Sequence, residues 1–320
     1  MNATSFCAGL AILAMFASVA SAQYPSRPIR IIVPIPPGGA PDVAARVIGP
    51  KLAEQLGQAV IIDNRTGANG NIAGTAVAKS APDGYTLLLA PDSLLTINPH
   101  IYDKMPFDTL KDLVPVASLV SNEFVLSVNP SVPAKTFAEF IDFARKANPP
   151  LPYASAGNGS QHQLAMEMLK KRAGIALTHV PFRGGSPATI ATIAGDTKVM
   201  FAGSSTAPQI QAGKLRALAV TGAHRSSAFP DLPTIADFYP GYELTIWLGL
   251  FAPTGTPEPI LNRLRAEVKT VLASLEVRAK LNNAGGMNTF NTTPEEFAAL
   301  VKRDYDKYGK IVRDVGIKTD

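Results

Sequence analysis

Three times along the chain, an apolar strand-like run leads into a glycine-rich loop and then into a helix pattern. The three loops are residues 37–42, 155–160 and 182–186. The runs before them are rich in β-branched residues, and apolar residues recur at helical spacing after them. Consecutive units of this kind require a parallel sheet with helices on its faces. The repetition therefore predicts an α/β fold.

The units form two cycles, and 320 residues at about 150 per domain fit two domains. The expected strands are residues 29–34, 59–63, 85–90, 124–128, 151–154, 199–201 and 215–220. The expected helices are residues 44–56, 71–79, 136–146, 161–172 and 188–194. Two more helices should close the chain, one beginning with a cap at Thr256-Pro257-Glu258 and one beginning with a capping box at Thr293. Pro50 should kink or break the first helix. No Pro/Gly linker separates the cycles, which favours two lobes joined by more than one crossing.

The N-terminus has the pattern of a cleavable export signal. An apolar run over residues 8–17 is followed by Ser18–Ala22, which ends in an A-x-A motif, so we expect the mature chain to begin at Gln23. The single cysteine, Cys7, lies in this leader, and the mature chain would have no disulfide and no thiolate site. No later run contains the roughly 20 consecutive apolar residues that a membrane span requires. We therefore expect a soluble protein of the bacterial periplasm.

Composition excludes several other classes. Hydrophobic residues make up 46% of the chain and charged residues 17%, which is typical of a globular protein rather than a disordered one. The net charge of +5 is spread without a basic run, so nucleic acid is not an expected partner. A mildly basic surface favours anionic small molecules only weakly.

The glycine-rich loops indicate anion binding. The first N–H groups of a helix have no intrahelical partner, and glycine lets an anion approach that backbone closely. In doubly wound sheets such loops lie at the carboxyl ends of the strands, where ligands bind. The sequence alone leaves open whether these loops face one another or are only tight turns.

Catalytic and metal motifs are absent from the sequence. The run Gly157-Asn158-Gly159-Ser160-Gln161 is not the G-x-S-x-G of a nucleophile elbow. Residues 64–71 lack the lysine of a phosphate loop and do not complete a dinucleotide fingerprint. The four histidines, at positions 100, 162, 179 and 224, have no metal-ligand spacing. A catalytic site assembled from distant residues remains an alternative.

A set of longer motifs runs through most of the chain. They are Tyr24-Pro25-Ser26-Arg27-Pro28-Ile29, Val33-Pro34 through Pro36-Pro37-Gly38-Gly39 to Asp42, residues 63–70, Asn98-Pro99-His100-Ile101-Tyr102, residues 157–162, His179-Val180-Pro181-Phe182-Arg183-Gly184, residues 214–221, 240–247 and 252–257. From residue 24 to about 315 the chain resembles the substrate-binding receptors of tripartite tricarboxylate transporters, the Bug or TctC-like family. Pro41 and Pro50 depart from the family pattern in the first loop and helix.

The resemblance implies a periplasmic-binding-protein-like fold, with two doubly wound α/β lobes, a ligand cleft and a hinge between them. It places lobe 1 at residues 23–121 plus 222–320 and lobe 2 at residues 122–221. It implies a non-catalytic, monomeric receptor without cofactor or metal, which binds a small carboxylate and delivers it to membrane transporter subunits. The alternatives are a sensor that presents the ligand to a signalling partner, and a hydrolase or transferase with a nonlocal site.

The candidate ligand-binding residues come from the loops and from the ends of strands. They are Gly38, Gly39, Ala40, Asp42, Ser93, Ser155, Gly157, Asn158, Gly159, Ser160, His162, Phe182, Arg183, Gly184, Ser204 and Ser205. Asp42 could instead cap its helix, because its charge would repel a carboxylate. His162 could orient its loop or touch ligand, and Arg183 could pair with a second acid group or stay solvated. Phe182 and Trp247 could pack on the ligand's body or in the core.

Overall fold

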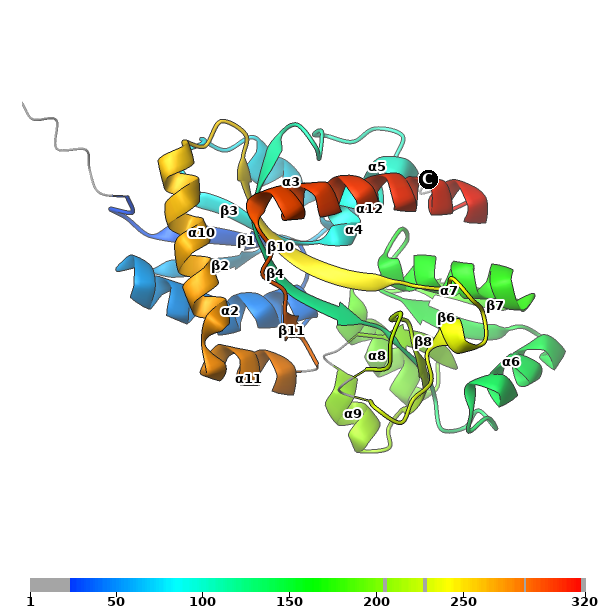
Figure 1. Ribbon diagram of the computed structural model, residues 1–320. Helices are drawn as coiled ribbons and strands as arrows, with labels where there is room; N and C mark the ends of the chain where they lie inside the picture. The colour runs from blue at the N-terminus through cyan, green and yellow to red at the C-terminus, as the bar shows by residue number, and fades with distance from the viewer. Residues whose placement is uncertain (1–23, 204–205, 227–228, 285, 318–320) are drawn as a thin grey trace, which may run out of the picture.

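The computed structural model describes residues 24–203, 206–226, 229–284 and 286–317. The predicted leader, residues 1–22, and the candidates Ser204 and Ser205 lie outside the described residues. The chain forms two mixed sheets, each with helices on its faces, and the two resulting lobes lie end to end (Figure 1). The predicted two-lobed α/β fold is confirmed.

The first sheet has six strands in the order β11-β4-β10-β3-β1-β2. They are β1 Ile29–Val33, β2 Val60–Asn64, β3 Thr86–Pro91, β4 Leu113–Glu123, β10 Thr245–Pro253 and β11 Asn288–Thr289. β1 pairs in parallel with β2 and β3, as the β-α-β units predict. β10 is antiparallel to both β3 and β4, and these antiparallel pairs were not predicted.

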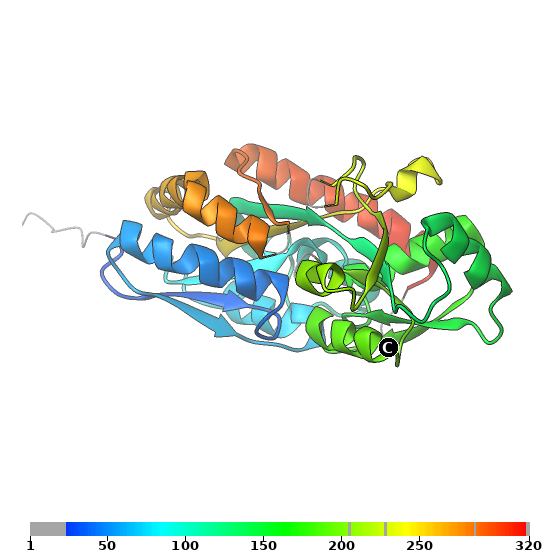
Figure 2. The same ribbon diagram turned by 90° about the horizontal axis from the view of Figure 1, so that it is seen from below.

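Helices cover both faces of the first sheet. On one face, α2 Ala40–Leu56, α10 Glu258–Ala273 and α11 Leu275–Asn283 share an aliphatic core with the strands. On the other face lie α3 Asn71–Ala78, α4 Asp92–Thr96 and the first half of α12 Pro294–Val315. Viewed from below, α2 and α11 lie on the same side of the sheet (Figure 2). Each helix buries one apolar stripe, so the sheet is shielded from water on both sides.

The second sheet has five strands in the order β7-β6-β8-β5-β9. They are β5 Val125–Val128, β6 Leu151–Ser155, β7 Leu177–Pro181, β8 Val199–Ala202 and β9 Arg216–Val220. The accompanying helices are α6 Phe137–Lys146, α7 Gln161–Ala173, α8 Gly185–Ala194 and the short α9 Ala207–Gln211. α6 and α7 pack into one large core, whereas Ala188 of α8 packs on the opposite face.

The lobes are joined where long strands pass between them. β4 continues into β5 with only Phe124 between them, and β9 returns to β10 through residues 221–244. Thr221 ties the two crossings together, because its N–H donates to the Phe124 carbonyl at 2.9 Å and its hydroxyl donates to the Leu244 carbonyl at 2.7 Å. The Phe124 N–H in turn donates to the Thr221 hydroxyl at 2.9 Å. More than one crossing joins the lobes, as predicted.

α12 also spans both lobes, along the top of the molecule in Figure 1. Its first half packs Phe297 with the first sheet's core, and its second half packs Tyr308 and Val312 with the second lobe's core. Residues from the return segment, including Ile235 and Tyr242, also pack with the second core. The residue boundaries proposed for the two lobes stay a prediction.

The helix ends confirm some predictions and correct others. Thr293 forms the predicted capping box with Glu296 at the start of α12. Thr256 does not cap α10, whose N-cap is Pro257; its hydroxyl bonds the Pro253 carbonyl instead. A further helix, α11, follows α10 before α12.

The break predicted at Pro50 does not occur, and α2 continues through it. Pro50 removes the N–H that would bond the Arg46 carbonyl. Both residues are on the exposed side of the helix, so water can satisfy that carbonyl. Ile48 and Leu52, which are buried on the other side, hold the helix against the sheet.

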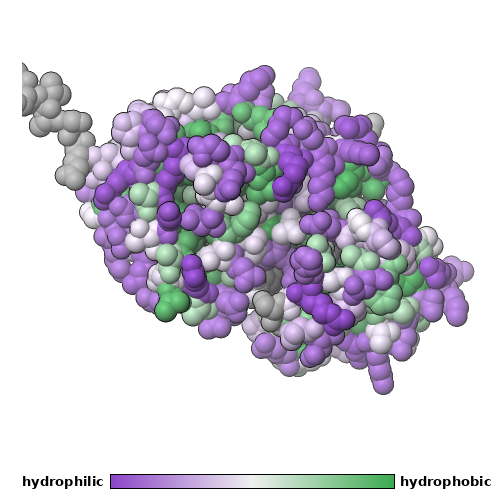
Figure 3. All heavy atoms as spheres, viewed as in Figure 1, coloured by the Kyte–Doolittle hydropathy of each residue, from purple (hydrophilic) through white to green (hydrophobic). Residues whose placement is uncertain are grey.

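Within the described ranges, no helix has both the length and the hydropathy that crossing a bilayer requires. The face shown in Figure 3 is mostly hydrophilic, with small hydrophobic areas scattered over it.

Candidate functional site

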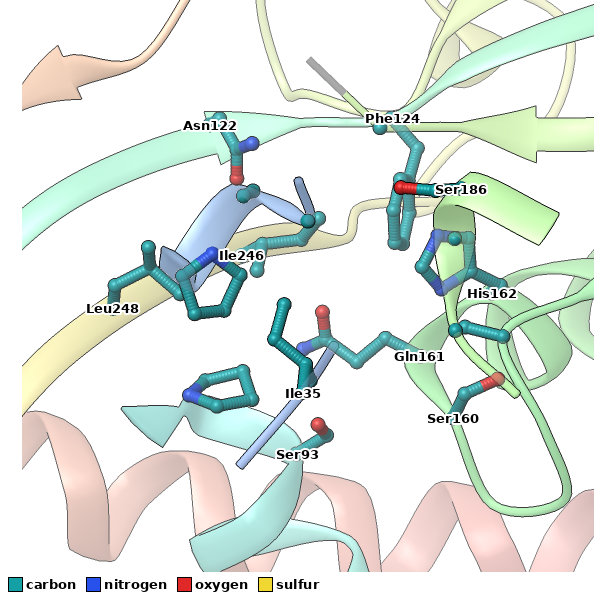
Figure 4. Close-up of a pocket in the computed structure, with 18 of the residues that line it drawn as sticks. Ile35, Ser93, Asn122, Phe124, Ser160, Gln161, His162, Ser186, Ile246 and Leu248 are labelled. Carbon is teal, nitrogen blue, oxygen red and sulfur yellow. The ribbon is translucent and has the colours of Figure 1, made fainter. Parts of the chain in front are cut away.

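A cavity of about 130 Å³ lies where the two lobes meet. Strands of the first sheet, loop residues that follow β6 and β8 of the second sheet, and four helices surround it (Figure 4). Its lining consists of Pro34, Ile35, Gly39, Ala40, Pro41, Asn69, Pro91, Ser93, Asn122, Phe124, Ala156, Ser160, Gln161, His162, Gly184, Gly185, Ser186, Thr189, Gly203, Thr206, Ile246 and Leu248. None of these side chains carries a formal charge at neutral pH. We call this space the inner cavity.

Three long helices direct their N-termini at the inner cavity, one from the first lobe and two from the second. Residues 39–41 begin α2, residues 160–162 begin α7 and residues 184–186 begin α8. Their first N–H groups have no intrahelical partner and carry the positive ends of the helix dipoles. The three glycine-rich loops that the sequence singled out therefore face one another across the cleft.

The positive ends of α7 and α8 are not compensated by acidic residues. Neither helix has an acidic residue in its first turn. By contrast, α6, α10 and α12 all carry glutamate in the first turn, which is the usual arrangement. The helices that face the cavity thus leave their N–H groups available to an outside anion.

The first turn of α2 does contain an acid, Asp42, but its charge is already engaged. The Asp42 carboxylate accepts hydrogen bonds from the Gly38 N–H at 2.9 Å, from Arg46 at 3.0 Å and from the Asn64 amide at 2.9 Å. Burial acts to raise the pKa of Asp42, but the hydrogen bonds from Arg46 and Gly38 outweigh it and lower that pKa. The N-cap is Gly39, so Asp42 is not the cap. It fixes the loop, and Gly38 holds a φ of 87°.

The loop before α7 lies closely against the first lobe. Ser160 caps α7 by accepting from the Gln163 N–H at 3.4 Å. Gly159 has a φ of 74°, and a Cβ there would overlap Cδ1 of Ile101 on α5 Asn98–Ile101. Gln161 reaches across the cleft and donates from its side-chain amide to the Asp92 carboxyl. These contacts hold the two lobes together at the floor of the inner cavity.

Asp92 is completely buried at the start of α4. One carboxyl oxygen accepts from the Ser93 N–H at 2.8 Å and the other from Gln161. Burial first, and the nearby Asp304 carboxylate second, raise the pKa of Asp92 well above its ordinary value. Asp304 in turn accepts from the Trp247 indole N–H at 2.8 Å. This environment disfavours the charged form of the Asp92 carboxyl beneath the cavity.

His162 lies against Phe124, with ring centroids 4.4 Å apart. Its apolar surroundings lower the pKa of His162 to about 4, so the ring is neutral at physiological pH. In the part of the chain that the structure describes, neither ring nitrogen has a hydrogen-bond partner. A neutral imidazole facing the cavity can donate one hydrogen bond to a ligand without adding charge.

One wall of the inner cavity is hydrocarbon. Ile246 and Leu248 project from β10, Ile35 approaches from the loop after β1, and Phe124 approaches from the crossing between β4 and β5 (Figure 4). Trp247, between the two β10 residues, points to the opposite side and packs in the core. The core alternative for Trp247 is therefore the correct one.

A second, larger cavity of about 590 Å³ adjoins the first along the same cleft. The two share Pro34, Ile35, Asn69, Ala156 and Gly184. Gly157, Asn158, Phe182 and Arg183 line only this outer cavity. Arg183 is exposed, and it is the one charged side chain among the residues that line it.

The predicted site residues thus divide into four groups. The inner cavity is lined by Gly39, Ala40, Ser93, Ser160, His162 and Gly184, and the outer cavity by Gly157, Asn158, Phe182 and Arg183. The loops are supported, without lining either cavity, by Gly38, Asp42, Ser155 and Gly159. The remaining two, Ser204 and Ser205, lie outside the described residues. A role in ligand binding stays a prediction for all of them.

Several lining residues were missed by the sequence reasoning. The largest omissions are Ile35, Asn69, Asn122, Phe124, Gln161, Gly185, Ser186, Ile246 and Leu248. Gly185 and Ser186 belong to a loop already chosen and could have been included. The β4 and β10 residues carried no local signal, because their position depends on strands that pass between the lobes.

A serine and a histidine distant in sequence do meet. The Ser155 hydroxyl lies 2.6 Å from Nε2 of His179. The same hydroxyl also donates to the Gly157 carbonyl and accepts from the Gly157 N–H, both at 3.1 Å. Ser155 is fully buried and lines neither cavity. This pair braces the loop and is not exposed as a nucleophile would be.

Among the described residues, no group of three or more His, Cys, Asp or Glu side chains is arranged to hold a metal ion.

Comparison with known proteins identifies the family. Residues 44–317 match the model of TctC, the tripartite tricarboxylate transporter family receptor. Protein BugT of Bordetella pertussis is 34% identical over 99% of both chains.

Three solved structures are also similar. R. palustris Rpa4515 with adipate has a TM-score of 0.89, is 33% identical and covers 92% of this chain and 99% of its own. A structure described as a periplasmic transporter has a TM-score of 0.88, 37% identity and coverage of 93% and 100%. MatC from Rhodopseudomonas palustris with bound malate has a TM-score of 0.84, 32% identity and coverage of 90% and 100%. The chain therefore belongs to the TctC family of tripartite tricarboxylate transporter receptors, and it is a periplasmic solute-binding protein rather than an enzyme.

Proposed function

We propose that this receptor captures a small carboxylate in the inner cavity and delivers it to membrane transporter subunits. The observation that carries the proposal is the convergence of the N-termini of α2, α7 and α8 on one space whose lining side chains are uncharged. An anion there meets unpaired N–H groups and positive helix ends from both lobes. The relatives solved with adipate and with malate support a carboxylate as the ligand.

Backbone donors are sufficient for useful affinity. A micromolar complex requires about 8 kcal/mol. Hydrogen bonds to a charged group contribute roughly 1.5–3 kcal/mol each, so three or four of them reach that order before the entropic cost of binding is deducted. No arginine is needed inside the inner cavity.

Ligand binding would favour the closed arrangement of the lobes. A carboxylate between α2 and α7 or α8 contacts both lobes only when they are close together, so it binds the closed state more tightly than an open one. The strand crossings at Phe124 and Thr221 are the natural hinge, because the chain passes between the lobes there. Small-angle scattering should show a more compact particle with saturating ligand; identical scattering with and without ligand would contradict closure.

A thermal-shift screen tests the ligand class. The panel contains mono-, di- and tricarboxylates, aromatic acids and nicotinate-like compounds. Before the screen, the protein is dialysed against denaturant and refolded, so that bound ligand is removed. A ligand at 100 times its Kd adds about 2.7 kcal/mol of stability. For a chain of this size that raises Tm by roughly 5 °C. Recovery of the compound unchanged is expected, and no response to any acid would refute the proposal.

Export is also part of the proposal. Cleavage after Ala22 would release a chain that begins at Gln23. Mass spectrometry of the periplasmic fraction should find that N-terminus, whereas an intact Met1 in the cytoplasmic fraction alone would contradict it.

A further inference from the structure

The contact between the lobes covers a carboxyl group that lines neither the inner nor the outer cavity. Asp92, at the start of α4, is completely buried, and Gln161 reaches from the second lobe to donate a hydrogen bond to it (Figure 4). We infer that closing the cleft binds one proton at Asp92, so that ligand capture is coupled to proton uptake. This inference rests on the proposed function, because it describes a second event in the closure that an acid drives.

The donors that contact the Asp92 carboxyl are all neutral. They are the Ser93 N–H at 2.8 Å, the Gln161 side-chain amide and the backbone N–H of Trp247. Among the described residues, no lysine or arginine forms an ion pair with Asp92. A carboxylate taken out of water without a cation is strongly disfavoured, whereas the protonated acid is not. The closed arrangement therefore favours the neutral form of Asp92.

A second buried carboxyl group adds to this preference. Asp304 of α12 is 5% exposed, and its charge acts against a negative charge on Asp92. The Trp247 indole N–H donates to Asp304 at 2.8 Å. Arg303 lies 3.4 Å from Asp304, but its side chain is 72% exposed and solvent screens it. One carboxyl group of this pair can thus keep its charge while the other is neutral.

The other elements packed against α4 bring few titratable groups. β3 and β10 contain none, and the first turn of α7 contains one. The remaining groups, besides Asp304 and Arg303, are Tyr308 on α12, Glu243 before β10, His100 on α5 and His162 on α7. Burial raises the pKa of Tyr308 well above its ordinary value, so that hydroxyl stays neutral. None of these groups supplies a cation that contacts Asp92 in the described structure.

Opening the cleft would remove Gln161 from the Asp92 carboxyl. Gln161 belongs to the second lobe and occupies one of the two carboxyl oxygens, so lobe separation admits water there. Water solvates the charge, and the pKa of Asp92 then falls from its raised value toward the ordinary value of about 3.9. Between the two pKa values, the open form is ionised and the closed form holds a proton taken from the solvent. Ligand affinity therefore falls as pH rises through this window.

Calorimetry on the intact mature chain counts the protons. The probe is adipate or malate or, if neither binds, the acid of the thermal-shift panel that most raises Tm. Each titration is repeated at one pH in two buffers with different heats of ionisation. The reference is Asp92→Asn, because asparagine stays neutral and its amide can still bond Gln161. We expect the natural chain to take up more protons than this variant, by up to one per acid bound.

The affinities supply a second readout. The Kd of the natural chain divided by that of Asp92→Asn should rise with pH, by up to about tenfold per pH unit. The comparison cancels the contribution of His162, whose pKa of about 4 in its buried position would rise on exposure, so that closure releases a proton from this ring in both proteins.

Two more variants locate the proton. Asp304→Asn removes the neighbouring negative charge, so proton uptake should persist and shift to lower pH. Glu123→Gln is the control, because burial also raises the pKa of Glu123, at the end of β4. Its partners, Ser226 and the Gly222 N–H, lie on the segment that returns from β9 to β10 rather than across the cleft. This variant should keep the proton uptake of the natural chain.

The outcomes separate this inference from the proposed function. If acids bind but the natural chain and Asp92→Asn take up equal numbers of protons, within about 0.1, from about pH 5 to 8, the inference is wrong and the carboxylate receptor stands. Loss of uptake in Glu123→Gln, or an unmoved uptake curve in Asp304→Asn, would also overturn the assignment to Asp92. If none of the acids binds, the proposed function fails and this inference fails with it.

Discussion

Replacing Gly159 with alanine should impede closure of the cleft. Gly159 precedes α7 of the second lobe, and a Cβ at this position would overlap Cδ1 of Ile101, on α5 of the first lobe. Ile101 is 3% exposed, so its side chain can move aside only by disturbing its neighbours. Such overpacking costs about 1–3 kcal/mol. Because the contact exists only when the lobes meet, that energy opposes closure.

The expected loss of affinity follows from this energy. A penalty of 1–3 kcal/mol on the closed state weakens ligand binding roughly 5- to 150-fold. The positive φ of 74° adds a second effect, since a non-glycine residue there costs about 1 kcal/mol in open and closed states alike. The strain therefore lowers Tm, whereas the steric contact lowers affinity.

Two further variants separate these effects. Gly174→Ala is the matched control, because Gly174 has a φ of 63° and no atom lies within 4 Å of its Cβ position. It should lower Tm and leave affinity unchanged. Ile101→Val removes Cδ1, the atom that would be overlapped, and should restore binding to the Gly159→Ala protein. Calorimetry with the best acid from the thermal-shift screen measures all four proteins. Full affinity in Gly159→Ala, or no recovery in the double variant, would refute the reasoning.

Three other predictions concern charge and stability. The Asp92→Asn protein should become more stable relative to the natural chain as pH rises above about 4. The reason is that the raised pKa of Asp92 makes the folded natural chain hold a proton that the unfolded chain releases. A difference in Tm between the two proteins that stays constant from pH 4 to 8 would contradict this. Arg183→Ala should weaken the binding of adipate up to about fivefold and leave the affinity for hexanoate unchanged, since an exposed ion pair contributes about 0.2–1 kcal/mol. Calorimetry that shows equal losses of affinity for both acids would argue against a role of Arg183 in binding a second carboxylate. Thr293→Ala should cost about 1 kcal/mol in urea unfolding by removing the capping box of α12, and Thr270→Ala, at an exposed position inside α10, is the control.

The sequence predicts those parts of the fold that depend on neighbouring residues. The β-α-β units, the glycine-rich loops before α2, α7 and α8, and the Thr293 capping box all follow from local patterns. The long strands β4 and β10 were missed. β4 includes Pro115 and three polar residues from Ser118 to Asn122, and β10 includes Gly249, so neither shows a clear strand pattern.

The site, like the fold, was predictable only where it depends on neighbouring residues. The loops that supply backbone N–H groups were identified, because glycine before a helix is a local signal. The residues that complete the cavity, such as Phe124 and Leu248, are brought there by the crossing of the two lobes. Asp42 illustrates the limit of local reasoning. Its partners Arg46 and Asn64 decide that it supports the loop, and Asn64 lies on β2, 22 residues further along the chain.

A crystal structure with the acid that most raises Tm tests the central claim most directly. We expect one carboxylate oxygen within about 2.7–3.2 Å of backbone nitrogens at the start of α2 and another at the same distance from those of α7 or α8, so that both lobes hold the same group. A carboxylate bound only by Arg183 in the outer cavity, or by N–H groups of a single lobe, would contradict the account.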